Sequence, residues 1–214
     1  MDGKSRRSAP AARTGVVCLA TAALLVAGVA RAEGDAAAAA ESRACDRVAV
    51  GVEVDLLPTV VSAIDGELGG ALQFWAGRGR NRLRLVGAKL HYPDGLTEAP
   101  FADQQSTVVA VLYDRFFQDE FRGPWVAVGL EYWWSSIGLE TGSERGTWTT
   151  TVATVGAGWV FPVWRGLYLN PWGAGHLPFD TGAVQVGSAT YQPRAMAAEV
   201  SLKVGWSFSG FGAR

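Results

Sequence analysis

From residue 47 onward, apolar and polar side chains alternate with a period of two residues. In the C-terminal stretch AEVSLKVGWSF, the large apolar side chains fall on one parity, and Glu199 and Lys203 fall on the other. Such alternation is typical of a strand with one apolar and one polar face, and no segment carries a helical stripe. The pattern predicts an all-β domain of eight strands, at 47–57, 67–76, 82–92, 106–117, 124–134, 149–163, 167–177 and 198–208.

The connections between these runs alternate in length. Three of them are short, with the sequences GRGRN, QDEFRG and WRG, and the connections between them are longer. Short turns at one end and long loops at the other are typical of outer-membrane barrels, whose strands of about ten residues alternate apolar-out and polar-in. The sequence therefore predicts an eight-stranded antiparallel up-and-down transmembrane β-barrel over residues 47–208, followed by a tail at 209–214.

The tryptophans favour the same interpretation. Seven of the nine fall at expected strand ends, and Trp159 and Trp172 lie nearer the middle of their strands. Indole rings prefer the membrane interface, because they are apolar but carry one hydrogen-bond donor. The expected interface tryptophans are Trp75, Trp125, Trp133, Trp134, Trp148, Trp164 and Trp206.

The chain resembles the small eight-stranded outer-membrane barrels of the OmpA/OmpX type. The resemblance covers residues 47–208 and is most specific in the last strand, where Lys203 to Phe208 alternate and finish on an aromatic residue. It implies that the barrel-assembly machinery recognises Phe208 and that outer-membrane lipid and lipopolysaccharide surround the barrel. One departure is that six residues follow Phe208.

The polar parity is expected to face the lumen. An eight-stranded barrel is just wide enough for its own side chains to fill, and buried charges must be paired. We predict a polar network in which Lys203 meets Glu53 or Glu199. The expected lumen residues are Glu53, Asp55, Gln73, Glu131, Asn170, His176, Glu199 and Lys203.

The third run does not keep one parity, since Leu83 and Leu85 disagree with Val86. Two interpretations remain open. Either a bulge lies near residues 85–87, or Arg82 and Arg84 sit at the rim and reach the headgroup phosphates. The basic turn beside them favours the second.

No catalytic or metal site emerges from the sequence. The two histidines, His91 and His176, lie near the expected outer end, and neither forms a His-x-Ser pair. Ser135, Ser136 or Asp94 lies within the same region, but no spacing selects a base and a nucleophile. We expect no cofactor and no metal, since two histidines and one mature cysteine make no cluster.

The N-terminus predicts export. Residues 1–32 combine a basic start, an apolar run from Gly15 to Ala30 and an Ala-x-Ala cleavage site at 30–32, which is typical of a signal peptide; an uncleaved anchor is the alternative. Residues 33–46 form an expected periplasmic linker that carries Cys45. Removing five basic residues and one acidic residue with the signal leaves 14 basic and 19 acidic residues, a net charge of −5. That balance argues against nucleic-acid binding.

These features predict an integral outer-membrane protein that is non-enzymatic and acts in envelope integrity or surface interaction. The expected contact loops lie around residues 93–105, 135–148 and 178–195, and their chemistry names no extracellular ligand. A lipid-A-modifying enzyme and a soluble periplasmic lipocalin-like barrel are the alternatives. The second of these predicts a polar outer face and an apolar interior, the inverse of the faces expected here.

Overall fold

The structure is a computed structural model that describes residues 48–64, 67 and 69–209. The predicted signal peptide (1–32), the predicted linker (33–46) and residues 210–214 of the tail lie outside the described residues. None of the helices in the described residues is long and apolar enough to cross a membrane.

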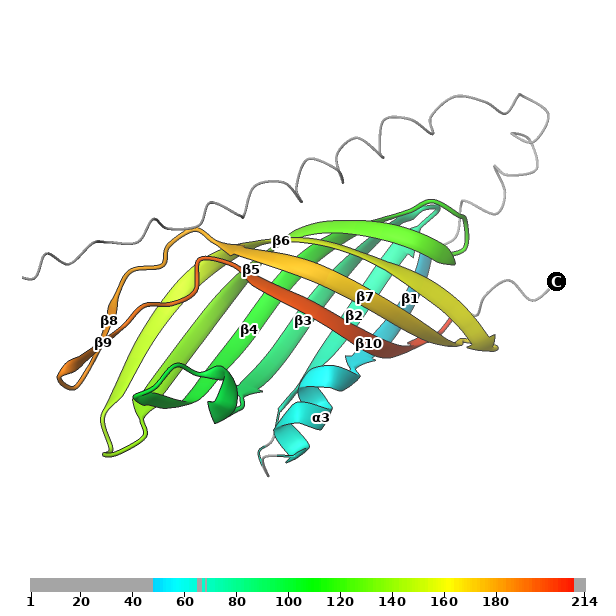
Figure 1. The fold of residues 1–214 in the computed structure, drawn as a ribbon. Coiled ribbons are helices and arrows are strands. Elements are labelled where there is room, and N and C mark those ends of the chain that lie inside the picture. Colours follow the sequence, from blue (N-terminus) through cyan, green and yellow to red (C-terminus); the bar gives the residue numbers. More distant parts are fainter. Residues whose placement is uncertain (1–47, 65–66, 68, 210–214) are drawn as a thin grey trace, which may run out of the picture. The chain divides into compact units, whose positions relative to one another are not determined.

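Eight strands close into one antiparallel barrel in the order β1-β10-β7-β6-β5-β4-β3-β2 (Figure 1), so the predicted architecture is confirmed. The first and last strands make the closing seam, where Val54 pairs with Val204. The strands of the barrel are β1 (Val48–Asp55), β2 (Gly70–Arg78), β3 (Asn81–Tyr92), β4 (Phe101–Phe116), β5 (Gly123–Leu139), β6 (Arg145–Trp164), β7 (Leu167–Pro178) and β10 (Ala197–Ser207).

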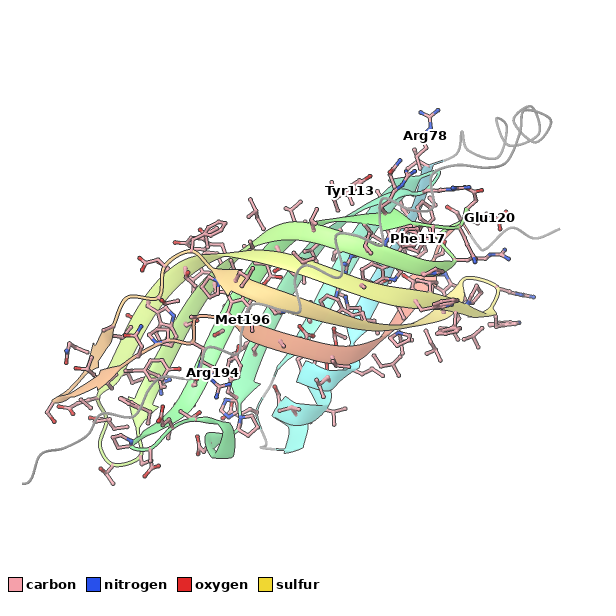
Figure 2. The ribbon with its side chains drawn as sticks, turned by 45° about the horizontal axis from the view of Figure 1, so that its top comes forward. Arg78, Tyr113, Phe117, Glu120, Arg194 and Met196 are labelled. Atoms are coloured by element: carbon pink, nitrogen blue, oxygen red, sulfur yellow. The ribbon has the colours of Figure 1, made fainter. Side chains whose placement is uncertain are left out.

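The barrel has a turn end and a loop end. At the turn end, residues 79–80, 117–122 and 165–166 connect neighbouring strands. At the loop end lie helix α3 (Leu56–Ile64), the 3-10 helix η1 (Asp94–Leu96) and a hairpin of β8 (Val184–Val186) and β9 (Ala189–Tyr191). In Figure 2, Arg78 and Glu120 mark the turn end, and Arg194 lies toward the loop end.

Alternation along each strand gives the wall two different faces. In β5, Val128, Leu130 and Tyr132 are exposed on the outside, whereas Ala127 and Glu131 are buried. The same alternation surrounds the barrel, so its outer face is a band of large apolar side chains. Members of this band include Val50, Val54, Leu72, Phe74, Leu83, Leu85, Val109, Val111, Val128, Leu130, Val155, Phe161, Leu169, Val200 and Leu202.

Strand β3 is regular, so neither interpretation of its mixed parity is right. Its register with β2 and β4 runs without a shift, and Leu83 and Leu85 are exposed on the outer wall. Arg82 and Arg84 therefore point inward and are buried. Val86 shares the parity of Arg82 and Arg84 and also points inward, where it packs with Ala110 and Leu112. Apolar residues therefore lie on both faces of the strand here and hide the period.

Helix α3 was not predicted. The first strand ends at Asp55, and the Asp55 side chain caps the helix by accepting the backbone N–H of Leu57 at 3.3 Å. Pro58 is tolerated because it lies in the first turn, where the backbone N–H has no intrahelical partner. The helix packs closely on the start of β2, since a Cβ on Gly70 would lie 2.8 Å from the Thr59 hydroxyl.

The loop end is more ordered than the sequence predicts. Strands β5 and β6 continue to Leu139 and from Arg145, so most of the predicted loop 135–148 is strand. In the predicted loop 178–195, Gly187 has a φ of 58° in the two-residue turn between β8 and β9, a conformation that favours glycine. The hairpin packs with the ends of β4, β5 and β6 in a small second core of Phe101, Ile137, Leu139, Trp148, Val184, Val186, Ala189 and Tyr191.

Candidate functional site in the barrel interior

The turn-end half of the interior is filled by a network of charged side chains, called here the plug. Three cations and three carboxylates in it are almost completely buried. Three positive and three negative formal charges balance, as a low-dielectric interior requires. The six residues are Arg82, Arg84, Lys203, Glu53, Asp55 and Asp114.

Asp114 holds both arginines. Its Oδ2 accepts from Arg82 Nε at 2.6 Å, and its Oδ1 accepts from Arg84 Nη2 at 2.8 Å and Nε at 3.1 Å. Arg84 Nη1 also donates to Gln73 Oε1 at 2.7 Å. Strand β4 thus supplies the carboxylate for two guanidinium groups on β3, its neighbour.

Glu53 gathers donors from two further strands. Its Oε1 accepts from Arg82 Nη1 at 2.8 Å, from Tyr168 Oη at 2.9 Å and from Asn170 Nδ2 at 3.1 Å. Tyr168 in turn accepts from Trp75 Nε1 at 2.7 Å. The plug therefore crosses the lumen from β3 to β7 and ties the closing seam to both.

Lys203 does not meet either predicted partner. Within the described residues it forms no ion pair with Glu53 or Glu199, so the predicted contact is wrong. Its Nζ donates to Gln73 Oε1 at 3.4 Å and lies 3.3 Å from the ring centre of Trp172. The nearest carboxylate in the register is Asp55, its pairing partner across the seam, and Asp55 accepts from Ser201 and from Trp172 Nε1.

Aromatic rings pack around the plug from the inside. Trp75 and Trp125 are buried in the interior, and the Arg84 guanidinium lies 5.0 Å from the Trp125 ring centre. Trp133 also points inward and donates to Glu131 Oε2 at 2.6 Å. These three tryptophans, which the sequence predicts at the membrane interface, therefore point into the barrel and not onto its outer wall.

Glycines on the inner face make room for these rings. A Cβ on Gly158 would lie 2.5 Å from the Trp125 ring, and one on Gly205 would overlap the Tyr168 ring. Separations this short require something to move, so the wall at these positions accepts only glycine without rearrangement.

The remaining expected interface tryptophans take different positions. Trp134, Trp164 and Trp206 are exposed on the outer wall, and Trp148 packs against the second core at the loop end. Phe208 is exposed, and its backbone N–H donates to the Val50 carbonyl at 2.9 Å beside the seam. Their roles at the membrane interface and in assembly stay predictions.

The loop-end half holds open space instead of a plug. A cavity of about 310 Å³, called here the mouth cavity, is lined by the aromatic rings of Tyr92, Trp133, Trp148 and Tyr191 together with His176, Asp180 and Arg194. Below it lies an inner cavity of about 60 Å³. Trp133 and His176 line both cavities, so they form the neck between them.

A histidine lies between two carboxylates at this neck. His176 Nδ1 is 3.4 Å from Glu131 Oε1, and His176 Nε2 is 3.4 Å from Glu199 Oε2. Thr154 Oγ1 donates to Glu131 Oε1 at 2.7 Å. Three of the expected lumen residues thus form a separate cluster above the plug, while Glu53, Asp55, Gln73, Asn170 and Lys203 belong to the plug.

The residues considered for catalysis have other contacts. His91 Nδ1 lies 3.9 Å from Asp103 Oδ1. Ser135 Oγ lies 2.8 Å from Ser106 Oγ, and Ser136 Oγ accepts from Arg145 at 3.1 Å. These contacts do not assemble a nucleophile with a base.

One ion pair outside the barrel wall has a shifted pKa. At the turn end, Asp119 Oδ1 accepts from Arg80 Nε at 2.8 Å. This hydrogen bond lowers the pKa of Asp119 below its ordinary value. The two side chains are 41% and 40% exposed. The pair is therefore solvated and contributes little to the stability of the fold.

Sequence reasoning missed the two arginines, Asp114 and Tyr168. Strict parity would have found three of them: Tyr168 shares its face with Asn170, and Arg82 and Arg84 share the face opposite Leu83 and Leu85. Asp114 was hidden at the end of an apolar run. Position at a strand end predicts an interface residue even where the parity of the ring points inward, so these rings need parity as a second criterion.

The fold resembles that of two solved structures. A major outer membrane protein from Thermus thermophilus aligns with a TM-score of 0.45 at 12% identity, covering 75% of this chain and 98% of that one. Neisserial surface protein A (NspA) aligns with a TM-score of 0.46 at 13% identity, covering 75% and 96%. No protein-family model and no curated protein matches the chain.

Proposed function

We propose that this protein is an integral outer-membrane barrel that is closed to ions and has no enzymatic activity. Its role lies in envelope integrity or in contacts made by its loop end. The observation that carries the proposal is the band of large apolar side chains on the outer face of a closed barrel. In water such a band would be an aggregation site, whereas a bilayer covers it.

The band argues against the soluble lipocalin-like alternative. A soluble barrel buries its apolar face inside and presents polar groups to water, but here charges fill the turn-end interior and apolar groups cover the outside. A closed barrel also satisfies its backbone hydrogen bonds between strands, which a lipid environment requires.

The lengths of the connections support one orientation. Short turns are typical of the periplasmic side and long connections of the outer side. In this orientation the turn end, with Arg78 and Glu120 (Figure 2), faces the periplasm, and the mouth cavity opens at the cell surface.

The plug supports closure to ions. Its charges are hydrogen-bonded across the lumen and packed against tryptophan rings, so an ion would have to displace a balanced, buried network. We expect no steady conductance in planar bilayers. Large steady conductance from the purified, folded protein would refute the closed lumen while leaving the membrane location intact.

Two experiments test the wider proposal. The protein should pellet with outer membranes, resist extraction by urea and run faster on gels without boiling than after boiling; recovery from the soluble periplasm would refute the membrane location. Mass spectrometry of lipid A from cells with and without the gene tests the enzymatic alternative. Unchanged acyl chains are expected, and an altered acyl pattern would overturn the non-enzymatic role.

A further inference from the structure

We propose that the mouth cavity binds a small organic cation: an amine carried on a compact apolar body. The proposal goes beyond the function proposed above, and it rests on the barrel fold and not on its location in a membrane. Three features of the loop-end interior lead to it, namely the size of the cavity, the chemistry of its walls and the charge at its neck.

The size of the mouth cavity suits a small molecule. Its volume of about 310 Å³ lies at the lower end of the range for ligand pockets, roughly 300–1,000 Å³. The plug beneath the neck closes the other route. A ligand therefore enters from the loop end. Its body occupies the mouth cavity, and its amine passes the neck between Trp133 and His176 to reach Glu199, which lines the inner cavity.

The walls of the cavity are aromatic. The rings of Trp133 and His176 lie 5.7 Å apart at the neck, and those of Trp148 and Tyr191 lie 5.5 Å apart near the rim. Indole and phenol faces carry negative partial charge and attract cations. They also provide the apolar surface that the body of the ligand requires.

The neck is acidic. Glu131 and Glu199 line the inner cavity and Asp180 lines the mouth cavity, together with His176 and Arg194. Apart from Asp55, which belongs to the balanced plug, carboxylates therefore exceed cations by one even when the imidazole is protonated. The Glu131 carboxylate is occupied by Trp133, Thr154 and His176. The Glu199 side chain is 29% exposed and contacts His176 through Oε2, which leaves acceptor positions on its carboxylate for an incoming donor.

The inner cavity combines acidic groups with an aliphatic wall, which suits an ammonium group carried on a short hydrocarbon chain. The walls contributed by β3 and β4 are aliphatic, with Val86, Leu90, Val108 and Leu112 facing the acidic side. An anion would meet the excess of carboxylates. A neutral apolar molecule would cover Glu199 without giving it a donor, which is unfavourable for a carboxylate.

The test uses the full-length protein in zwitterionic nanodiscs, titrated with 2-phenylethylamine by calorimetry. The matched probes are 2-phenylethanol, which has the same shape and no charge, and phenylacetate, which has the opposite charge. We expect saturable one-to-one binding of the amine and affinity at least about tenfold weaker for the other two, because each lacks one charge-assisted hydrogen bond.

Two variants locate the site. Glu199→Gln keeps the shape of the side chain and removes its charge, and it should weaken amine binding by about tenfold. Glu120→Gln, at the turn end, is the matched control and should leave binding unchanged. Unchanged gel mobility of the unboiled variants shows that each is folded.

Three results would overturn the proposal. They are the lack of saturable amine binding at millimolar concentration, equal binding of phenylacetate, and full affinity in folded Glu199→Gln. None of them bears on outer-membrane fractionation, so the failure of this inference is distinguishable from failure of the proposed function.

Discussion

Replacing Asp114 with asparagine should destabilise the barrel far more than loss of the exposed carboxylate charge of Asp119 at the same end. Asp114→Asn keeps the size of the side chain and one acceptor oxygen. It removes the negative charge that faces Arg82 and Arg84 at 2.6–3.1 Å. Both guanidinium groups stay buried, and the plug is left with three cations and two carboxylates.

The expected magnitude follows from this burial. Removing one partner of a buried ion pair costs about 3–5 kcal/mol, because the remaining charge stays in a low-dielectric interior. The exposed pair of Arg80 and Asp119 is the comparison, because a solvated salt bridge stabilises the fold by only about 0–1 kcal/mol. Asp114→Asn should therefore lower the free energy of unfolding several times more than Asp119→Asn.

The assay is urea unfolding in lipid vesicles, followed by tryptophan fluorescence and by the mobility of unboiled samples. A second variant tests the mechanism. Arg84→Gln added to Asp114→Asn restores the balance of charge, so the double variant should be more stable than the sum of the single losses by at least about 1 kcal/mol. The reasoning fails if Asp114→Asn and Asp119→Asn are equally mild, or if the two losses at 84 and 114 are simply additive.

Three further predictions concern other parts of the barrel. Gly158→Ala should lower stability by about 1–3 kcal/mol in the same unfolding assay, because its Cβ would meet the Trp125 ring at 2.5 Å; Gly87→Ala, which meets nothing within 4 Å, should be neutral, and equal effects would contradict the packing argument. Phe208→Ser should reduce the amount of folded protein in outer membranes, whereas Phe179→Ser, similarly exposed in a loop, should not; normal assembly of Phe208→Ser would remove the residue as an insertion signal. The pKa of Asp119 is lowered in the folded protein, so its small contribution to folding stability is present above the ordinary aspartate pKa of 3.8 and is lost as pH falls through the lowered value. The difference in unfolding free energy between wild type and Asp119→Asn should therefore disappear in acid. A difference that grows in acid would contradict the direction of the pKa shift.

The barrel was predictable because its signal is repeated in every strand. The seam illustrates this: Val200 and Leu202 alternate with Ser201 and Lys203, and a single slip of one residue would expose Lys203 to lipid. Helix α3 was not predictable from the same period. Its residues LLPTVVSAI are rich in β-branched side chains, and the helix depends on the Asp55 cap and on packing against Gly70, which a strand period does not reveal.

The interior was less predictable, because for some tryptophans the position along the strand indicates the membrane interface while the parity indicates the lumen. Trp75 and Trp125 lie at strand ends, where interface rings are expected, but they share parity with Gln73 and Ala127 and point inward. Which carboxylate holds which cation is set by stagger between strands, so Lys203 was assigned to Glu53 or Glu199 instead of Gln73 and Trp172. The β8–β9 hairpin carried a readable signal, a Gly-Ser pair between two short alternating runs.

The two halves of the interior obey different physical constraints, and this difference favours ligand binding at one end over the other. At the turn end the formal charges of the plug balance, and aromatic rings fill the space next to the inward-facing glycines. A ligand there would have to break a network worth several kcal/mol. At the loop end the carboxylates outnumber the cations, Glu199 is partly exposed and lines the inner cavity, and the mouth cavity lies beyond the neck. A ligand there replaces water without displacing a side-chain partner. Any selective binding by this barrel is therefore expected at the mouth, with the plug acting as the rigid floor that fixes the depth of the site.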